Sequence, residues 1–287
     1  MRDATTGRLL VLATAVLFST GGVAIKLCSL GALDTAGLRA ALAALALVAF
    51  VRPPRTAFTR GAIAVGLCQA ATMLLFVVAN KLTTAAAAIF LQGTAPIWVA
   101  LLSLTLLREP IRRGDVGRLL AYGVGLALLV AAPAEPLASA PDPARGNLAA
   151  LASGVTWALV ITGLRWLASR TASQAGAAAV AGNVTLAAVL LPWIVSAPPS
   201  IGRTDALALA WLGIVQVGLS YALLTVGMRR VRAFEASILL LAEPVLSTLW
   251  AWLVFAERPG PLALAGCAIL LVAGALTIRG DAAADSR

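Results

Sequence analysis

Long apolar stretches fill almost the whole chain and are separated by short polar links. A helix that crosses a bilayer needs about 20 mainly apolar residues. Ten stretches meet this requirement: 9–29, 34–51, 61–80, 83–107, 114–132, 146–168, 172–195, 204–228, 232–256 and 260–278. The pattern predicts an all-α membrane protein with ten transmembrane helices and no length left over for a soluble domain.

Composition supports this class, because 61% of the residues are hydrophobic and only 12% are charged, where a soluble domain carries roughly a quarter. The net charge of +10 comes from short basic clusters between apolar stretches, which favours lipid headgroups over nucleic acid as the partner. The chain has no histidine, and its three cysteines lie inside apolar stretches without metal-ligand spacing. We therefore expect a lipid bilayer around the chain, no nucleic acid, no metal, no cofactor and no enzymatic activity.

Basic residues are divided unequally between the two sets of helix ends. Sixteen of the 22 lie at one set of ends, four lie at the other, and Lys26 and Arg39 lie inside predicted helices. Links on the cytoplasmic side carry the excess of Lys and Arg, so both termini are predicted to be cytoplasmic. Lys26 and Arg39 could attract a carboxylate or form a gate, but snorkelling to the outer surface or pairing is the preferred interpretation.

The two halves of the chain repeat each other. A shift of 148 residues places Pro96 on Pro244 and Glu109 on Glu257, and a shift of 139 residues matches Gly7 with Gly146, Phe18 with Trp157, and Lys26 with Arg165. Five helices per half is an odd number, so the second half must enter the membrane from the opposite side, as in transporters with inverted repeats. The predicted parts are a first five-helix repeat (1–132), a linker (133–145), a second repeat (146–279) and a cytoplasmic tail (280–287).

Several sequence blocks carry a family resemblance. They are REP (108–110), GRLLAYGVGLALLV (117–130), SYALLTVGMRRV (220–231), ASILLLAEPVLSTLWAWLVFAE (236–257) and LALAGCAILLVAGAL (262–276). With these blocks the chain resembles the drug/metabolite transporter superfamily, and within it the EamA-type exporters with ten spans. The resemblance implies a multi-pass protein of the bacterial-type inner (plasma) membrane that exports small metabolites through a central cavity. The chain looks closest to the YddG-like branch, whose implied substrates are aromatic and other apolar amino acids.

A few polar and aromatic residues lie deep in the predicted helices, where polar groups usually face a cavity or a neighbouring helix. Phe18 and Trp157 could line a cavity from both halves or simply pack, and the hydroxyl of Tyr221 could bind substrate, close a gate or bond another helix. An amide suits the zwitterionic head of an amino acid as well as a helix–helix hydrogen bond. The candidate substrate-binding residues are Phe18, Gln69, Gln92, Trp157, Gln216 and Tyr221.

Glu243 stands directly before Pro244, whereas the equivalent position in the first half is Ala95. Pro96 and Pro244 are predicted hinges, because proline loosens a helix. Glu243 could bond loosened backbone amides or Tyr221, which is the preferred interpretation, or it could bind substrate or a proton. Proton-coupled export would need such a titratable group in the path, whereas downhill export needs none.

Together these features predict a secondary exporter of small amphipathic molecules, with amino acids first, that works by alternating access. Multidrug or quaternary-cation efflux is the alternative within transport, since a cation prefers an acidic or aromatic lining. A membrane enzyme or a scaffold is the alternative outside transport, and the lack of histidine and of clustered acidic residues argues against the enzyme. A monomer is the working oligomeric state.

Overall fold

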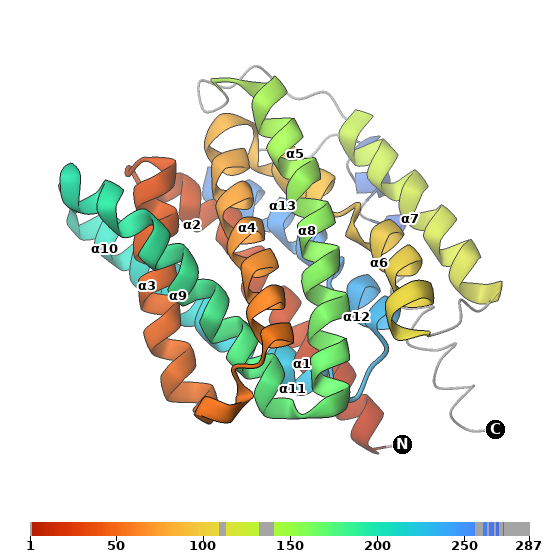
Figure 1. Ribbon diagram of the computed structural model, residues 1–287. Coiled ribbons are helices and arrows are strands. Elements are labelled where there is room, and N and C mark those ends of the chain that lie inside the picture. Colours follow the sequence, from red (N-terminus) through yellow and green to blue (C-terminus); the bar gives the residue numbers. More distant parts are fainter. Residues whose placement is uncertain are drawn as a thin grey trace.

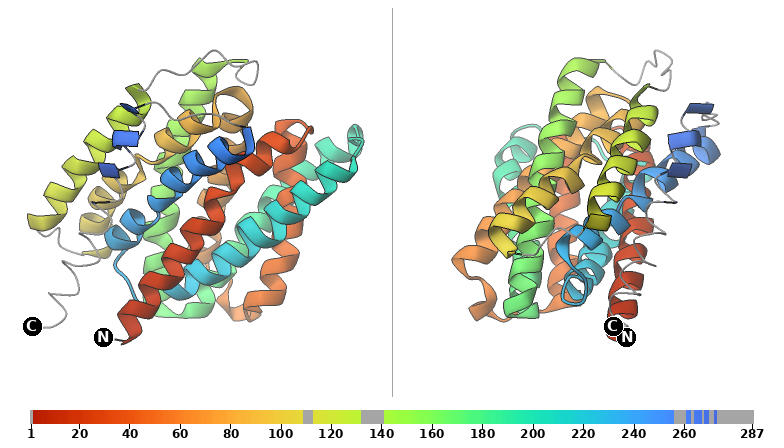
Figure 2. Two further views of the ribbon diagram at one scale, coloured as in Figure 1. Left: turned by 180° about the vertical axis from the view of Figure 1, so that it is seen from behind. Right: turned by 90° about the vertical axis from the view of Figure 1, so that its right-hand side faces the viewer.

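The computed structural model describes residues 2–108, 113–131 and 141–255, with scattered positions between 261 and 272. Every regular element within these residues is a helix, and the long ones stand side by side in an inclined bundle (Figures 1 and 2). The elements are α1 (Arg2–Ser19), α2 (Gly21–Leu27), α3 (Ala32–Val51), η1 (Arg55–Ala57), α4 (Arg60–Leu82), α5 (Ala85–Gln92), α6 (Ala95–Leu102), η2 (Ser103–Leu107), α7 (Arg113–Ala131), α8 (Pro143–Arg170), α9 (Ala172–Ser196), α10 (Arg203–Ala210), η3 (Trp211–Leu219), α11 (Ser220–Gly227), α12 (Ala233–Leu239) and α13 (Ala242–Phe255).

Eight helical segments in the described part of the chain are long and apolar enough to cross a membrane. They correspond to the first four and the sixth to ninth predicted spans. Helix α7 occupies the predicted fifth span, and most of the tenth, 260–278, lies outside the described residues, as do Glu109 and Glu257.

Helix α8 begins three residues before the predicted start of the second repeat. The carboxylate of Asp142 accepts a hydrogen bond from the backbone N–H of Arg145 at 3.1 Å, and Pro143 occupies the first helical position. Both are standard features of a helix N-terminus. The predicted linker 133–145 therefore ends in helix, and its residues 133–140 lie outside the described part.

The first helices of the two halves run in opposite directions. Arg8, near the beginning of α1, forms an ion pair with Glu235 at the beginning of α12, with 2.6 Å between Nε and Oε1. Arg165, near the end of α8, donates from Nη1 to the carbonyl oxygen of Met228 at 3.0 Å, just ahead of α12. The beginning of α1 and the end of α8 therefore lie at the same end of the bundle.

Two glycines matched by the repeat make equivalent contacts at opposite ends. A Cβ atom on Gly7 would lie 2.5 Å from Cβ of Arg230, in the link before α12. A Cβ atom on Gly146 would lie 2.7 Å from Cβ of Thr83, in the link before α5. Each half thus packs the beginning of its first helix against the other half, and only glycine allows so close an approach.

A matched pair of cations shows the same symmetry. Lys26 donates from Nζ to the carbonyl oxygen of Thr83 at 3.0 Å, in the link before α5. Its repeat equivalent, Arg165, donates to Met228 in the link before α12. Each half therefore fastens the link before its fourth span with a cation from its own first span.

Helix α4 lies between α8 and α9, and its contact with α9 is nearly backbone to backbone. A Cβ atom on Gly66 would lie 2.9 Å from the carbonyl oxygen of Ala178, and one on Gly182 would lie 2.6 Å from that of Gly66. Small residues at a helix crossing are a common way to pack helices tightly in a membrane.

Replacing Gly182 by valine is expected to lower the unfolding temperature of the purified protein in detergent. The added side chain must push α4 and α9 apart, and overpacking of this kind costs about 1–3 kcal/mol. Gly123 of α7 provides the matched control, because a Cβ atom there meets nothing within 4 Å. Equal losses of stability from the two substitutions would contradict this description of the α4–α9 contact.

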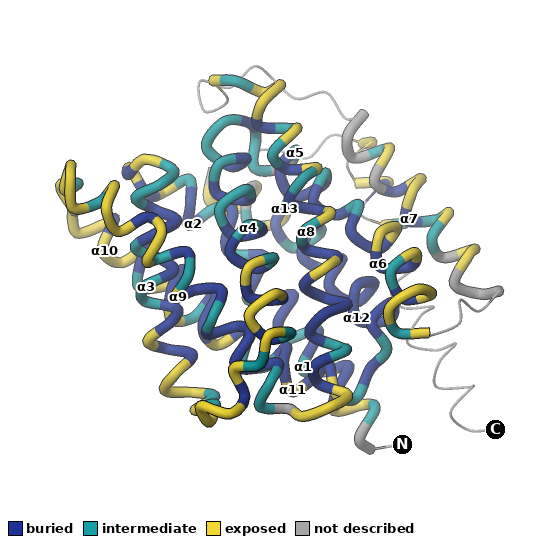
Figure 3. Tube along the Cα trace, viewed as in Figure 1, coloured by how far each residue is buried: buried dark blue, intermediate teal, exposed yellow. Residues whose placement is uncertain are grey.

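The outward surface of the bundle is rich in exposed apolar side chains, whereas buried residues line the inward faces of the helices (Figure 3). Exposed examples come from several helices: Leu45, Leu67, Leu120, Leu148, Val189, Leu207 and Leu253. Apolar patches of this extent are rare on soluble monomers, and they suit contact with lipid tails.

The first span is interrupted between α1 and α2, which the sequence did not predict. The indole N–H of Trp250 donates to the hydroxyl of Ser19 at 2.8 Å, and the hydroxyl of Ser247 donates to the Ser19 carbonyl oxygen at 3.0 Å. The indole N–H of Trp211 donates to the hydroxyl of Thr20 at 2.9 Å. Polar groups of neighbouring helices thus bond the interrupted segment, as apolar surroundings require.

Candidate functional site

The fourth span of each half is broken just before its proline. The break between α5 and α6 precedes Pro96, and the break between α12 and α13 precedes Pro244. Proline has no N–H to donate, and its ring crowds the carbonyl group four residues earlier, which belongs to Gln92 or to Leu240. Helix α6 contacts α12 and α5 contacts α13, so the two breaks lie against each other near the centre of the bundle.

A small cavity lies between the two breaks. Its lining includes both prolines together with Gln92, Trp157 and Glu243. The cavity volume is about 20 Å³, on a scale at which one water molecule needs roughly 10–15 Å³. A space of this size holds about one water molecule and is too small for a metabolite.

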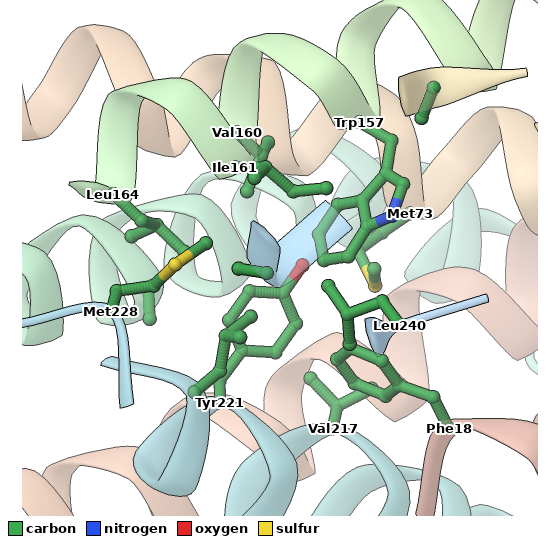
Figure 4. Packing of buried hydrophobic residues seen from close by; sticks show 14 of the residues in the cluster. Phe18, Met73, Trp157, Val160, Ile161, Leu164, Val217, Tyr221, Met228 and Leu240 are labelled. Atoms are coloured by element: carbon green, nitrogen blue, oxygen red, sulfur yellow. The ribbon is translucent and has the colours of Figure 1, made fainter. Parts of the chain in front are cut away.

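An aromatic cluster stands beside the cavity. The ring centroids of Phe18 and Trp157 are 5.8 Å apart, those of Phe18 and Tyr221 are 5.5 Å apart, and those of Trp157 and Tyr221 are 6.2 Å apart. All three contacts are edge to face, the geometry that aromatic pairs prefer. Figure 4 shows the Tyr221 hydroxyl directed into this cluster. The rings come from both halves of the chain and can offer apolar and aromatic groups a complementary surface.

Two predicted glutamines lie in different surroundings. Gln92 lines the cavity and donates from Nε2 to the hydroxyl of Ser153 at 2.7 Å. Gln69 is fully buried at the α4–α9 contact, where its Oε1 lies 3.0 Å from the position of a Cβ atom on Gly182. Neither amide atom of Gln69 has a hydrogen-bond partner among the described residues, so the structure does not use it as a helix–helix bond.

Gln216 lies in an irregular part of the eighth span. It belongs to η3, a π-helical segment inside an otherwise α-helical span, and such segments frequently occur at functional sites. Its Nε2 donates to the carbonyl oxygen of Phe18 at 3.4 Å, while its Oε1 lacks a partner within the described chain. The same is true of the hydroxyl of Tyr221, five residues later. Gln216 and Tyr221 both contact Phe18 of the aromatic cluster, and each has a side-chain oxygen without a hydrogen-bond partner among the described residues.

Glu243 occupies the first turn of α13, and its residue is only 8% exposed. The positive end of a helix dipole favours a carboxylate at this position. A bond to loosened backbone amides or to Tyr221 stays a prediction, and in this conformation the Tyr221 hydroxyl has no hydrogen-bond partner among the described residues. The carboxylate faces the cavity opposite Gln92 and Trp157.

Arg39 is the residue whose surroundings the sequence misjudged. Its helix begins at Ala32, so the side chain starts about two turns inside the bundle rather than at its surface. The residue is 1% exposed, and no carboxylate of the described chain forms an ion pair with it. It neither snorkels nor pairs. The helix start at Ala32, just after Gly31, was the signal that could have placed it correctly.

Comparison with known proteins shows the same division of the chain into two halves. The EamA-like transporter family matches residues 5–131 and 144–279, which together are nearly the whole chain and fall on its two halves. This chain belongs to the EamA-like transporter family. This EamA-like transporter is therefore a multi-pass membrane protein of a transporter family, built from two repeated domains.

One similar protein is the aromatic amino acid exporter YddG of Ancylobacter novellus, which is 33% identical over 184 residues. The match covers 63% of this EamA-like transporter and 62% of the exporter, so it spans less than two thirds of that relative. A solved crystal structure of a protein with 23% identity shares the fold, with a TM-score of 0.74 over 94% of this chain and 96% of that one.

Proposed function

We propose that this EamA-like transporter is a secondary exporter of amino acids with aromatic or apolar side chains. The carrying observation is the cavity between the two broken helices, with Phe18, Trp157 and Tyr221 beside it. Substrate sites of inverted-repeat transporters lie near the midplane, between such discontinuous helices. The similarity to an aromatic amino acid exporter supports the choice of substrate.

In this proposal a single chain spans the inner membrane ten times as two inverted repeats, with both termini in the cytoplasm. The ends close in turn around the central site, with Pro96 and Pro244 as hinges. The close contacts of Gly7 and Gly146 at opposite ends support this alternation, because the two halves pack against each other in an equivalent way at each end.

Purified protein in liposomes preloaded with labelled amino acids tests the proposal. Phenylalanine, tryptophan and leucine should leave protein-containing liposomes faster than protein-free ones, and a substitution of Trp157 by alanine should abolish most of the difference. Liposomes containing the Gly123→Ala variant, altered only on the outer face of α7, should behave as wild type. No release across a broad panel of amino acids would sink the proposal.

Efflux of quaternary cations is the second candidate, favoured by the carboxylate of Glu243 in a cavity that Trp157 also lines. A cation is attracted by a carboxylate and by an aromatic face. The two candidates predict different responses to one substitution.

Glu243→Gln is expected to abolish efflux of a quaternary cation and to leave amino-acid efflux partly intact. The substitution removes the negative charge while keeping the size and the hydrogen-bonding atoms of the side chain. Parallel flux measurements with labelled tetraphenylphosphonium and phenylalanine would compare the two. Equal losses for both ligands would remove the distinction between the candidates.

A further inference from the structure

Arg39 carries a buried positive charge near the middle of the bundle. It is the eighth residue of α3, about 10 Å along the helix from its beginning. Its Nη2 donates to the carbonyl oxygen of Met73 at 3.2 Å and contacts the Met73 sulfur at 3.4 Å. Its Nη1 has no partner within the described chain.

An unpaired guanidinium is unfavourable in apolar surroundings, and more so within a membrane. Arginine can form two parallel hydrogen bonds to a carboxylate, but one neutral carbonyl and a thioether are the recorded partners of Arg39. Among the described residues, no carboxylate forms an ion pair with the Arg39 guanidinium.

Other buried polar atoms near Arg39 also lack partners. The hydroxyl of Tyr221 interacts electrostatically with Arg39 and makes no hydrogen bond to a described residue. Gln69 lies one helical turn before Met73 on the same face of α4, with both amide atoms unused. A guanidinium, a phenol and an amide N–H, here contributed by α3, α11 and α4, are all donors, and an anionic acceptor suits each of them.

We propose that Arg39 is the counter-ion of the substrate carboxylate, with the Tyr221 hydroxyl as a second donor. The proposal rests on the proposed function and specifies its substrate class as molecules with a free carboxylate. The aromatic cluster around Tyr221 then holds the apolar side chain of the substrate. Glu243, which lines the cavity together with Trp157, receives the ammonium group on the same carbon atom as the carboxylate. A quaternary cation has no carboxylate and would leave Arg39 unpaired.

Ligands that differ only at the carboxyl group test this assignment on the wild-type protein. Labelled phenylalanine, phenylalaninamide and phenethylamine would be compared in the liposome efflux assay. Phenylalanine should be exported at least about tenfold faster at low concentration than either analogue, the factor expected for losing a charged hydrogen bond. Equal rates for the three ligands would overturn the carboxylate assignment alone. Absence of transport of every amino acid would overturn the proposed function, and this assignment with it.

Variants of Arg39 test whether this residue makes the discrimination. Arg39→Gln should reduce phenylalanine export by about tenfold or more and bring the ratio of phenylalanine to phenylalaninamide close to one. Arg39→Lys keeps the charge but loses the paired donors, so it should retain part of the discrimination with a raised KM. If the Arg39→Gln variant does not fold, the Arg39→Lys variant alone tests the proposal.

The control is Arg60→Gln, at the exposed beginning of α4, which should leave both rates and their ratio unchanged. An Arg39 with only a structural role would lower transport of all three ligands alike. A wild-type ratio in folded Arg39→Gln or Arg39→Lys protein would therefore overturn the proposal.

Discussion

Replacing Arg8 by methionine is expected to loosen the end of the bundle at which α1 meets α12. The side chains of Arg8 and Glu235 are 9% and 5% exposed, and their charged atoms are 2.6 Å apart. Removing one partner of a buried ion pair is generally destabilising, with typical losses of about 3–5 kcal/mol. Thermal unfolding of the purified variant should show this loss, and the double variant R8M/E235L should be more stable than R8M.

The functional consequence is confined to one end. The repeat equivalents of Arg8 and Glu235 at the opposite end are Asn147 and Ala87, which cannot form an ion pair. R8M should therefore favour the conformation that is open at the Arg8 end, the end predicted to face the cytoplasm. About 3 kcal/mol corresponds to about a hundredfold change in the ratio of closed to open molecules.

A surface ion pair offers the matched control. The side chains of Arg145 and Asp142 are 83% and 35% exposed, with 3.4 Å between their charged atoms. Such pairs contribute under about 1 kcal/mol, so R145M should leave the unfolding temperature almost unchanged. Comparable losses from R8M and R145M would contradict the role given to the buried pair.

Replacing Tyr221 by phenylalanine is expected to lower transport without lowering stability. The Tyr221 hydroxyl is fully buried and unbonded among the described residues, and an unsatisfied buried polar group costs about 1–3 kcal/mol. Its removal should raise the unfolding temperature or leave it unchanged. Transport of phenylalanine should nevertheless fall by about tenfold, because the hydroxyl becomes a donor only when substrate is bound.

The ring contacts make this test specific, because phenylalanine keeps the edge-to-face packing on Phe18 and Trp157. Tyr221→Ala, in contrast, should lower both stability and transport, since it also removes the ring. A phenylalanine variant that is less stable than wild type, or that transports as well as wild type, would refute the binding role of the hydroxyl.

The sequence predicted most of the helices because their apolar stretches have the length that a bilayer demands. It also predicted loosened helices at Pro96 and Pro244, next to the two breaks, since proline acts locally on the helix that contains it. It did not predict the break after Ser19 or the π-helical segment η3. Neither contains a proline, and the break after Ser19 is bonded by Trp211, Ser247 and Trp250 from other helices, which no local pattern reveals.

Two candidate site residues could be recognised in the sequence because their residue type is unusual at that depth in a membrane helix. Trp157 and Tyr221 stood out in this way, and the repeat linked Phe18 to Trp157. The surroundings of Arg39 were misjudged, because whether a charge finds a partner depends on side chains from distant parts of the chain. The ion pair of Arg8 and Glu235 joins residues 227 positions apart, so no local pattern in the sequence indicates it.

The central claim is that the cavity between the broken helices opens to each side of the membrane in turn. Ser237 of α12 lines this cavity, so Ser237→Cys, in a chain lacking Cys28, Cys68 and Cys267, places a thiol there. An impermeant maleimide would be added to either side of oriented vesicles, with and without phenylalanine. The account predicts labelling from both sides and protection by phenylalanine on each. Labelling from one side only, whatever the direction of the substrate gradient, would contradict it.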